Sequence, residues 1–161
     1  MDTLEIDEAI SEVVALTHGE AIKNGISVRT ERAAGLPLIQ ADRVQLQQVI
    51  LNLIVNAIEA LSGNGEGSRE LLITTETESE SVLVAFRDSG PGLSPAVLER
   101  VFEPFYSTKP GGLGMGLSIC RSIIEAHRGR LWATARVPAG VTFMFTLPAV
   151  VDLKGTAEWV G

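Results

Sequence analysis

Residues 42–61 carry the longest uninterrupted periodic pattern in the chain, and this pattern restricts the fold more than any other feature. Apolar side chains recur at positions i, i+3, i+4 and i+7 from Leu46 to Leu61. The spacing predicts a helix with one continuous apolar stripe, and Asp42 is the expected N-cap. Because such a stripe has to be buried against a second layer, we expect this helix to cover a sheet or other helices.

The remaining segments alternate between helical and strand-like patterns. Helical spacing predicts two further long helices and a short one, over residues 4–23, 115–127 and 95–101. Alternating or short apolar runs predict five strands, over residues 26–31, 71–77, 82–87, 131–136 and 141–147. In the last strand the residues sharing one face are Val141, Phe143, Phe145 and Leu147. Because helices and strands are interspersed, we predict an α/β (α+β) fold with a mixed sheet covered by helices on one face.

Length and charge narrow the functional classes. The 161 residues suffice for one well-buried core, and we predict a single domain over 1–148 followed by a C-terminal tail over 149–161. A net charge of −7 argues against a nucleic-acid partner. Any bound anion would therefore need local positive groups or backbone N–H groups. The single Cys120 excludes an internal disulfide or a cysteine-rich zinc site, and we expect it to be packed.

The expected location is cytoplasmic. No run approaches the roughly 18 to 20 apolar residues needed to span a bilayer, and the N-terminus is acidic where a signal peptide would be basic. We expect a cytosolic domain cut from a larger parent, and membrane attachment of that parent is compatible with the sequence.

A glycine-rich segment, Gly112-Leu113-Gly114-Met115-Gly116, runs into the predicted helix 115–127. The first turn of a helix has unpaired N–H groups and a partial positive charge, and glycines let a phosphate approach those amides. Neither a Walker A loop nor G-x-G-x-x-G fits this spacing. Taken alone, the segment is more commonly just a loop before a helix.

Asp88 ends a predicted buried strand and is followed by Gly90 and Gly92. A carboxylate in that place is costly unless a donor reaches it, and it could accept from an exocyclic amine such as adenine N6. Two glycines there would let a flat ligand lie against the backbone. An Asx-type turn after the strand explains the same residues equally well.

Asn52 and Asn56 lie one turn apart on the helix 42–61 and flank its apolar stripe. Their amide oxygens could bind Mg²⁺, or the pair could cap neighbouring loops. Lys109 follows the aromatic residues of the segment 101–110 and would bring positive charge to the glycines, although an exposed loop lysine is usually solvated surface.

Four motifs, taken together and in this order, resemble a known family. They are the asparagine helix, the Asp-x-Gly-x-Gly turn, the aromatic segment and the Gly-x-Gly-x-Gly-Leu start of a helix. They are similar to the N, G1, F and G2 boxes in the ATP-binding catalytic domain of bacterial sensor histidine kinases. The resemblance covers about residues 3–148. Two stretches look most like the nitrogen- and oxygen-sensing type of these kinases. Their sequences are Phe102-Glu-Pro-Phe…Ser-Thr-Lys109 and Asn56-Ala-Ile-Glu-Ala60.

The resemblance implies the Bergerat ATP-binding fold of the GHKL superfamily, a two-layer sandwich with a mostly antiparallel sheet and about three helices on one face. ATP and Mg²⁺ are the implied cofactors. Asn56 would hold the metal, and Asn52 would line the same site. Asp88 would accept from adenine N6, assisted by water and by Thr142. The other implied nucleotide-binding residues are Ala60, Gly90, Gly92, Lys109, Gly112, Leu113, Gly114, Met115, Gly116 and Leu117.

The resemblance also implies the reaction. Lys109 would lie near the γ-phosphate at the base of a lid, and the glycines would wrap the phosphates and act as its hinge. Phosphoryl transfer depends mainly on positioning and charge neutralisation. Related ATPases carry a glutamate one turn before the metal-binding asparagine to activate water. An amide at Asn52 cannot take that proton, which favours a kinase over a hydrolase.

The acceptor histidine of this family is missing, because neither His18 nor His127 lies in a matching sequence. We interpret His18 as a surface residue, and His127 as a cation or cap at a helix C-terminus. The partner that receives the phosphate would therefore be a separate dimerisation hairpin of the parent, with a response regulator as indirect partner, and the fragment alone would be monomeric. The alternatives are a serine kinase of the anti-sigma-factor type, an ATP-hydrolysing member and a degenerate partner-binding module.

Overall fold

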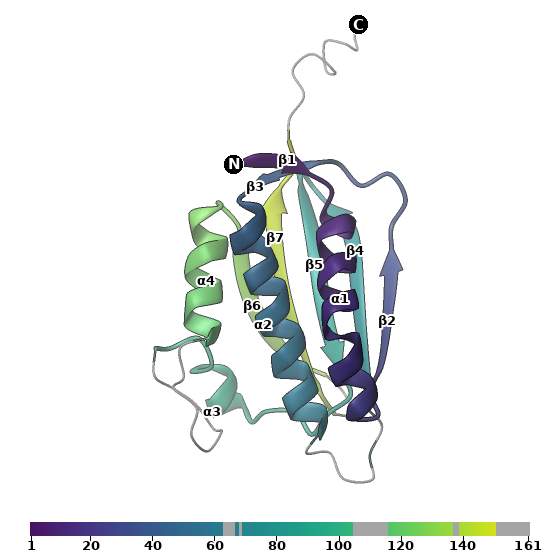
Figure 1. Cartoon of the computed structure of the whole chain (residues 1–161). Helices are drawn as coiled ribbons and strands as arrows, with labels where there is room; N and C mark the ends of the chain where they lie inside the picture. Colours follow the sequence, from purple (N-terminus) through teal and green to yellow (C-terminus); the bar gives the residue numbers. More distant parts are fainter. Residues whose placement is uncertain (63–66, 68, 105–115, 137–138, 151–161) are drawn as a thin grey trace, which may run out of the picture.

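The computed structural model describes residues 1–62, 67, 69–104, 116–136 and 139–150. Its strands are β1 (Asp2–Leu4), β2 (Ser27–Arg32), β3 (Ile39–Ala41), β4 (Glu70–Glu78), β5 (Ser81–Asp88), β6 (Arg130–Ala135) and β7 (Val141–Pro148). Five of them form one sheet in the order β2-β4-β5-β7-β6 (Figure 1). β2 is parallel to β4, whereas every other neighbour in this sheet is antiparallel.

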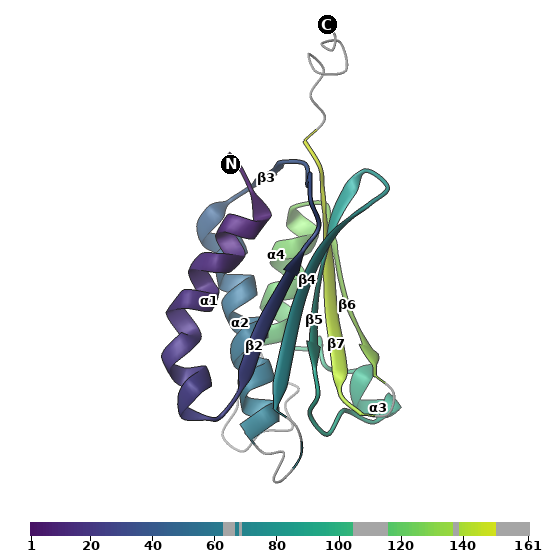
Figure 2. The ribbon, with the colours of Figure 1, turned by 90° about the vertical axis from the view of Figure 1, so that its right-hand side faces the viewer.

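The helices are α1 (Ile6–Lys23), α2 (Arg43–Ser62), α3 (Pro95–Leu98) and α4 (Gly116–Ala126). Figure 2 shows α1, α2 and α4 on one side of the large sheet, and no helix of the described residues covers its other side. The core lies between the two layers, where the rings of Phe86 and Phe145 stack with centroids 6.1 Å apart. The predicted two-layer fold with a mixed, mostly antiparallel sheet is confirmed.

The N-terminal boundary of the first helix was predicted wrongly. The sequence predicts a helix from residue 4, but α1 begins at Ile6 because Asp2–Leu4 pairs with Ile39–Ala41 in a two-stranded antiparallel sheet. Leu4 is buried in this strand. Strands of three residues are too short to show a period of two, so the sequence gives no signal for β1 or β3.

α2 is the core helix that its periodicity predicts. The Gln45 N–H donates to Asp42 Oδ1 at 2.9 Å, which confirms the N-cap. By length and composition alone α2 is also long and apolar enough to cross a membrane. Core helices of soluble proteins pass the same test. All eight residues of the predicted stripe are buried in the fold, namely Leu46, Val49, Ile50, Leu53, Ile54, Ala57, Ile58 and Leu61.

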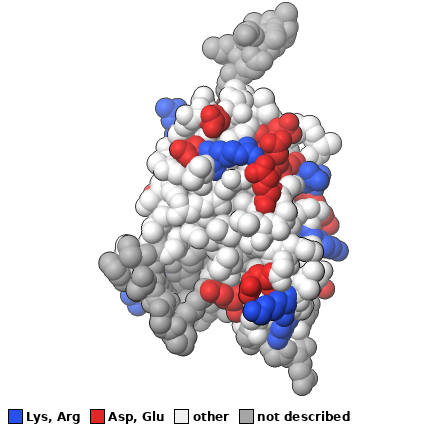
Figure 3. Space-filling model, viewed as in Figure 1, with Lys and Arg blue, Asp and Glu red and all other residues white. Residues whose placement is uncertain are grey.

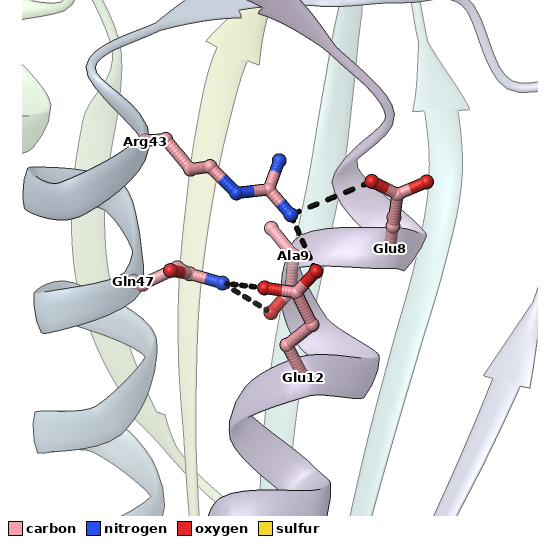
Figure 4. Close-up of polar contacts among 5 residues, drawn as sticks. All are labelled: Glu8, Ala9, Glu12, Arg43 and Gln47. Atoms are coloured by element: carbon pink, nitrogen blue, oxygen red, sulfur yellow. Dashed lines mark hydrogen bonds and ion pairs between the residues drawn. The ribbon is translucent and has the colours of Figure 1, made fainter.

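Polar contacts join the first turns of α2 to α1 (Figure 4). Arg43 pairs with Glu12 at 2.6 Å and with Glu8 at 3.4 Å. The Gln47 side chain donates to Glu12 at 2.8 Å and to the carbonyl of Ala9 at 3.5 Å. Hydrogen bonds from Gln47 and Arg43 lower the pKa of Glu12. Figure 3 shows a group of acidic and basic side chains near one end of the helical face, above a wide uncharged area.

Backbone pairing continues slightly beyond the predicted domain boundary at residue 148. The Ala149 N–H donates to the carbonyl of Glu80, and the Val150 N–H donates to the carbonyl of Leu38, both at 2.8 Å. Residues 151–161 lie outside the described residues. The boundary between the domain and its tail therefore stays a prediction.

Candidate functional site

Asp88 is the last residue of the central strand β5 and is only 4% exposed. Its Oδ1 accepts from the Gly90 N–H at 2.9 Å, and the Val141 N–H also donates to the carboxylate. Burial raises the pKa of Asp88, and these hydrogen bonds and the charge of Arg136 offset only part of that shift. Because a carboxylate has about four acceptor positions, Asp88 closes the Asx turn and can still accept from a further donor.

The backbone around the Asp88 turn is closely packed. Gly92 packs against Gly140, and a Cβ on Gly92 would lie 3.3 Å from the N and O atoms of Gly140. A Cβ on Gly140 would lie 2.1 Å from the Asp88 carbonyl oxygen, which also accepts from Arg136 Nη1 at 3.1 Å. Neither Gly140 nor Arg136 stood out in the sequence. The only signal was the Pro138-Ala-Gly140 order, which is typical of a turn.

The C-terminal part of α2 meets the same turn. A Cβ on Gly90 would lie 3.6 Å from the carbonyl oxygen of Ala60 and 3.1 Å from Asp88 Oδ1. The predicted residues Ala60, Asp88 and Gly90 are therefore brought together, with a backbone surface beside a buried acceptor. This arrangement suits a flat group that carries an amine.

Asn52 marks a second part of the site, where α2 meets α4. The first residue of α4 is Gly116, and a Cβ there would lie 4.0 Å from Asn52 Nδ2. Asn52 Nδ2 donates to Cys120 Sγ at 3.4 Å. Cys120 is fully buried, as expected, and burial raises the pKa of its thiol. Leu117 is half-buried against the core. The structure thus joins Asn52 to the N-terminus of α4.

The two parts lie along one stretch of α2. From Asn52 to Ala60 a helix rises about 12 Å, and Asn56 stands half-buried between them. A ligand along this stretch would meet the Asp88 acceptor at one end and the partial positive charge of the α4 N-terminus at the other. Among the described residues no group of three or more His, Cys, Asp and Glu could hold a metal.

Thr142 does not face this site. Val141 pairs with Asp88, whereas Thr142 pairs with Arg87. Because successive side chains of a strand point to opposite faces, Val141 shares the face of Asp88 and Thr142 lies on the other face of the sheet. Direct help from Thr142 to Asp88 is therefore ruled out. The alternation of Val141, Phe143, Phe145 and Leu147 already carried this information in the sequence.

Five of the predicted site residues cannot be placed. Lys109, Gly112, Leu113, Gly114 and Met115 lie outside the described residues. Their roles stay predictions.

The sequence and the fold match known proteins. Residues 41–151 match the family described as histidine kinase-, DNA gyrase B-, and HSP90-like ATPase. The chain belongs to this ATPase family. The catalytic domain of histidine kinase ThkA superimposes with a TM-score of 0.81 and 38% identity, covering 92% of this chain and 97% of that domain. The resemblance read from the four boxes is thereby confirmed at the level of the family and of the fold.

Two further relatives are larger proteins that match this chain over only part of their length. The sensor protein FixL of Bradyrhizobium diazoefficiens is 42% identical over 145 residues, which are 89% of this chain and 28% of FixL. Full-length ShkA in complex with AMPPNP superimposes with a TM-score of 0.82 and 27% identity, covering 94% of this chain and 31% of ShkA. The ATPase domain therefore spans less than a third of these relatives.

Proposed function

We propose that this domain binds Mg-ATP and transfers its γ-phosphate to a histidine on a separate helical hairpin of its parent kinase, for relay to a response regulator. One observation carries the proposal: a buried carboxylate acceptor and the N-terminus of α4 lie at opposite ends of the Asn52–Ala60 stretch. The comparisons support it, because the family consists of ATPases, ShkA was crystallised with AMPPNP and ThkA with the response regulator TrrA.

Adenine would occupy the Asp88 end. Its exocyclic amine would donate to the carboxylate, and its ring would lie against the backbone of Gly90 and Gly92. Val141 offers an apolar side chain beside Asp88, so the carboxylate would be the main polar determinant for adenine. Discrimination against guanine follows, because guanine presents a carbonyl oxygen where adenine has its amine, and two acceptors would face each other.

The phosphates would occupy the other end, beside the N-terminus of α4, because the N–H groups in the first turn of a helix have no partner within the helix. Asn52 would line this part, and the amide oxygen of Asn56 would bind Mg²⁺, which takes few protein oxygens when phosphate and water supply the rest. The metal would neutralise phosphate charge. Lys109 and the glycines from Gly112 remain our prediction for the γ-phosphate.

Binding of Mg-ATP should raise the melting temperature of the isolated chain. At a free ligand concentration of 100 Kd the stabilisation is about 2.7 kcal/mol, which corresponds to roughly 5 °C or more in a domain of this size. Differential scanning fluorimetry with Mg-ATP and with Mg-GTP measures this directly. We expect the melting temperature to rise with Mg-ATP and not with Mg-GTP. An unchanged melting temperature at millimolar Mg-ATP would favour the degenerate partner-binding module.

Replacing Asn52 with glutamate should convert part of the kinase activity into hydrolysis. A carboxylate can take a proton from water, whereas the amide of Asn52 cannot. We expect Asn52→Glu to raise phosphate release from Mg-ATP by about tenfold or more. Asn52→Gln is the matched control, since it lengthens the side chain without adding a base. Equal release by wild type and both variants would remove Asn52 from the reaction.

We further propose a cytoplasmic domain that is monomeric when separated from the hairpin. The anti-sigma-factor type of serine kinase shares the fold, so a partner protein phosphorylated on serine would favour that alternative. The sequence Phe102-Glu-Pro-Phe and the relatives named above favour the histidine kinase over this serine kinase.

A further inference from the structure

His127 follows the last residue of α4 and is 7% exposed. Its Nδ1 lies 2.7 Å from the carbonyl oxygen of Ile123, in the last turn of α4. Its Nε2 lies 3.0 Å from the backbone nitrogen of Asp42, the N-cap of α2. Both ring nitrogens are therefore engaged, one by each helix.

The two partners fix how the imidazole is protonated. A backbone N–H can only donate, so Nε2 accepts from Asp42. A carbonyl oxygen can only accept, so Nδ1–H donates to Ile123. These contacts assign the Nδ1–H tautomer to the ring. The prediction of a helix cap at His127 is thus confirmed.

His127 links the end of α4 to the start of α2. The hydrogen bond from Asn52 to Cys120 is another side-chain link between these helices. One link joins residue 52 to residue 120, and the other joins residue 42 to residue 127. The two helices consequently run antiparallel and are tied at both ends of their contact, over about 15 Å of α2. The direction in which the N-terminus of α4 points depends on both links.

We propose that His127 is a positioning residue for the phosphates of the nucleotide, acting through the orientation of α4. The inference rests on the proposed function, since α4 opens at Gly116 beside Asn52. α4 takes no part in the Asp88 end of the site, which is built from α2, β5 and β7. Loss of the His127 link should therefore weaken binding of phosphates while leaving binding of the base intact.

The test compares the affinities of adenosine, ADP and ATP, each with Mg²⁺, for the isolated chain and its variants. His127→Leu removes both hydrogen bonds, and we expect it to lower ATP and ADP affinity by about tenfold and adenosine affinity by less than about twofold. His127→Gln keeps an acceptor for the Asp42 N–H and should recover most of the ATP affinity. If His127→Leu does not fold, the wild type and His127→Gln still give the comparison, and a uniform loss for all three ligands in His127→Gln overturns the proposal.

Two controls separate positioning from general destabilisation. Ile73→Ala truncates a residue that is 1% exposed in β4, separated from β7 by β5. It should destabilise the fold without changing the ratio of ATP to adenosine affinity. Asp88→Asn should weaken all three ligands together. A His127→Leu variant that behaves like either control contradicts the proposal, whereas a wild type that binds none of the three ligands contradicts the proposed function instead.

Discussion

Asp88→Asn is expected to lower the affinity for Mg-ATP by an order of magnitude or more, the largest effect on binding that we expect from one substitution. The carboxylate already accepts from the N–H groups of Gly90 and Val141, and adenine would add a third donor. Asparagine has one carbonyl oxygen with two acceptor positions, and its amide nitrogen can only donate. At least one donor is left unpaired in a buried site, which costs about 1–3 kcal/mol.

Isothermal titration calorimetry on wild type and Asp88→Asn measures this loss. Asp2→Asn is the matched control, because it removes the same charge from an exposed position in β1. Equal affinity of wild type and Asp88→Asn would remove Asp88 from the site.

The same carboxylate makes binding and stability respond to acid in opposite directions. Burial raises the pKa of Asp88 above its usual 3.8, so the folded state takes up a proton at a higher pH than the unfolded state does. As the pH falls through the raised pKa, Asp88 contributes more to stability. Over the same range one oxygen becomes a donor and ATP affinity falls. If ATP affinity falls with pH in the wild type and does not fall in Asp88→Asn, the titration belongs to Asp88.

Gly140→Ala is expected to have the largest effect on stability. Gly140 has φ +106°, and an added Cβ would lie 2.1 Å from the carbonyl oxygen of Asp88. Backbone at the junction of β5 and β7 would have to move, so we expect a loss of at least about 3 kcal/mol in the free energy of unfolding. ATP affinity should fall as well, because the shift displaces Asp88.

Gly35→Ala separates close approach from backbone strain. Gly35 also has a positive φ, +69°, but no atom lies within 4 Å of the position of its Cβ. We expect this control to lose about 1 kcal/mol, measured for both variants by urea denaturation. A similar loss in the two variants would mean that the contact with Asp88 carries no extra cost.

Much of the fold could be predicted because its elements carry strong periodic signals. The stripe of α2, its cap at Asp42 and the alternation of β7 each depend on local residue spacing, and all three are confirmed. β1 and β3 could not be predicted, since three residues show no period and their pairing joins segments more than 30 residues apart.

The site could be predicted where motifs act through local backbone, and less well where side chains meet across the fold. The sequence placed Asp88, Gly90 and Ala60 correctly beside one another. The links from Asn52 to Cys120 and from Asp42 to His127 join residues 68 and 85 positions apart, which no local pattern reveals. Thr142 was misassigned although strand alternation already placed it on the opposite face.

Transfer of labelled phosphate tests the central claim most directly. The chain is incubated with Mg-ATP labelled on the γ-phosphate, alone and together with a separately produced acceptor hairpin of a sensor kinase, and acid-labile label is followed on each protein. We expect label on the hairpin histidine, none on this chain, and several-fold less label on the hairpin with Asp88→Asn at an ATP concentration near the wild-type Kd. Strong histidine labelling of this chain alone, or transfer that survives Asp88→Asn unchanged, would contradict the proposed function.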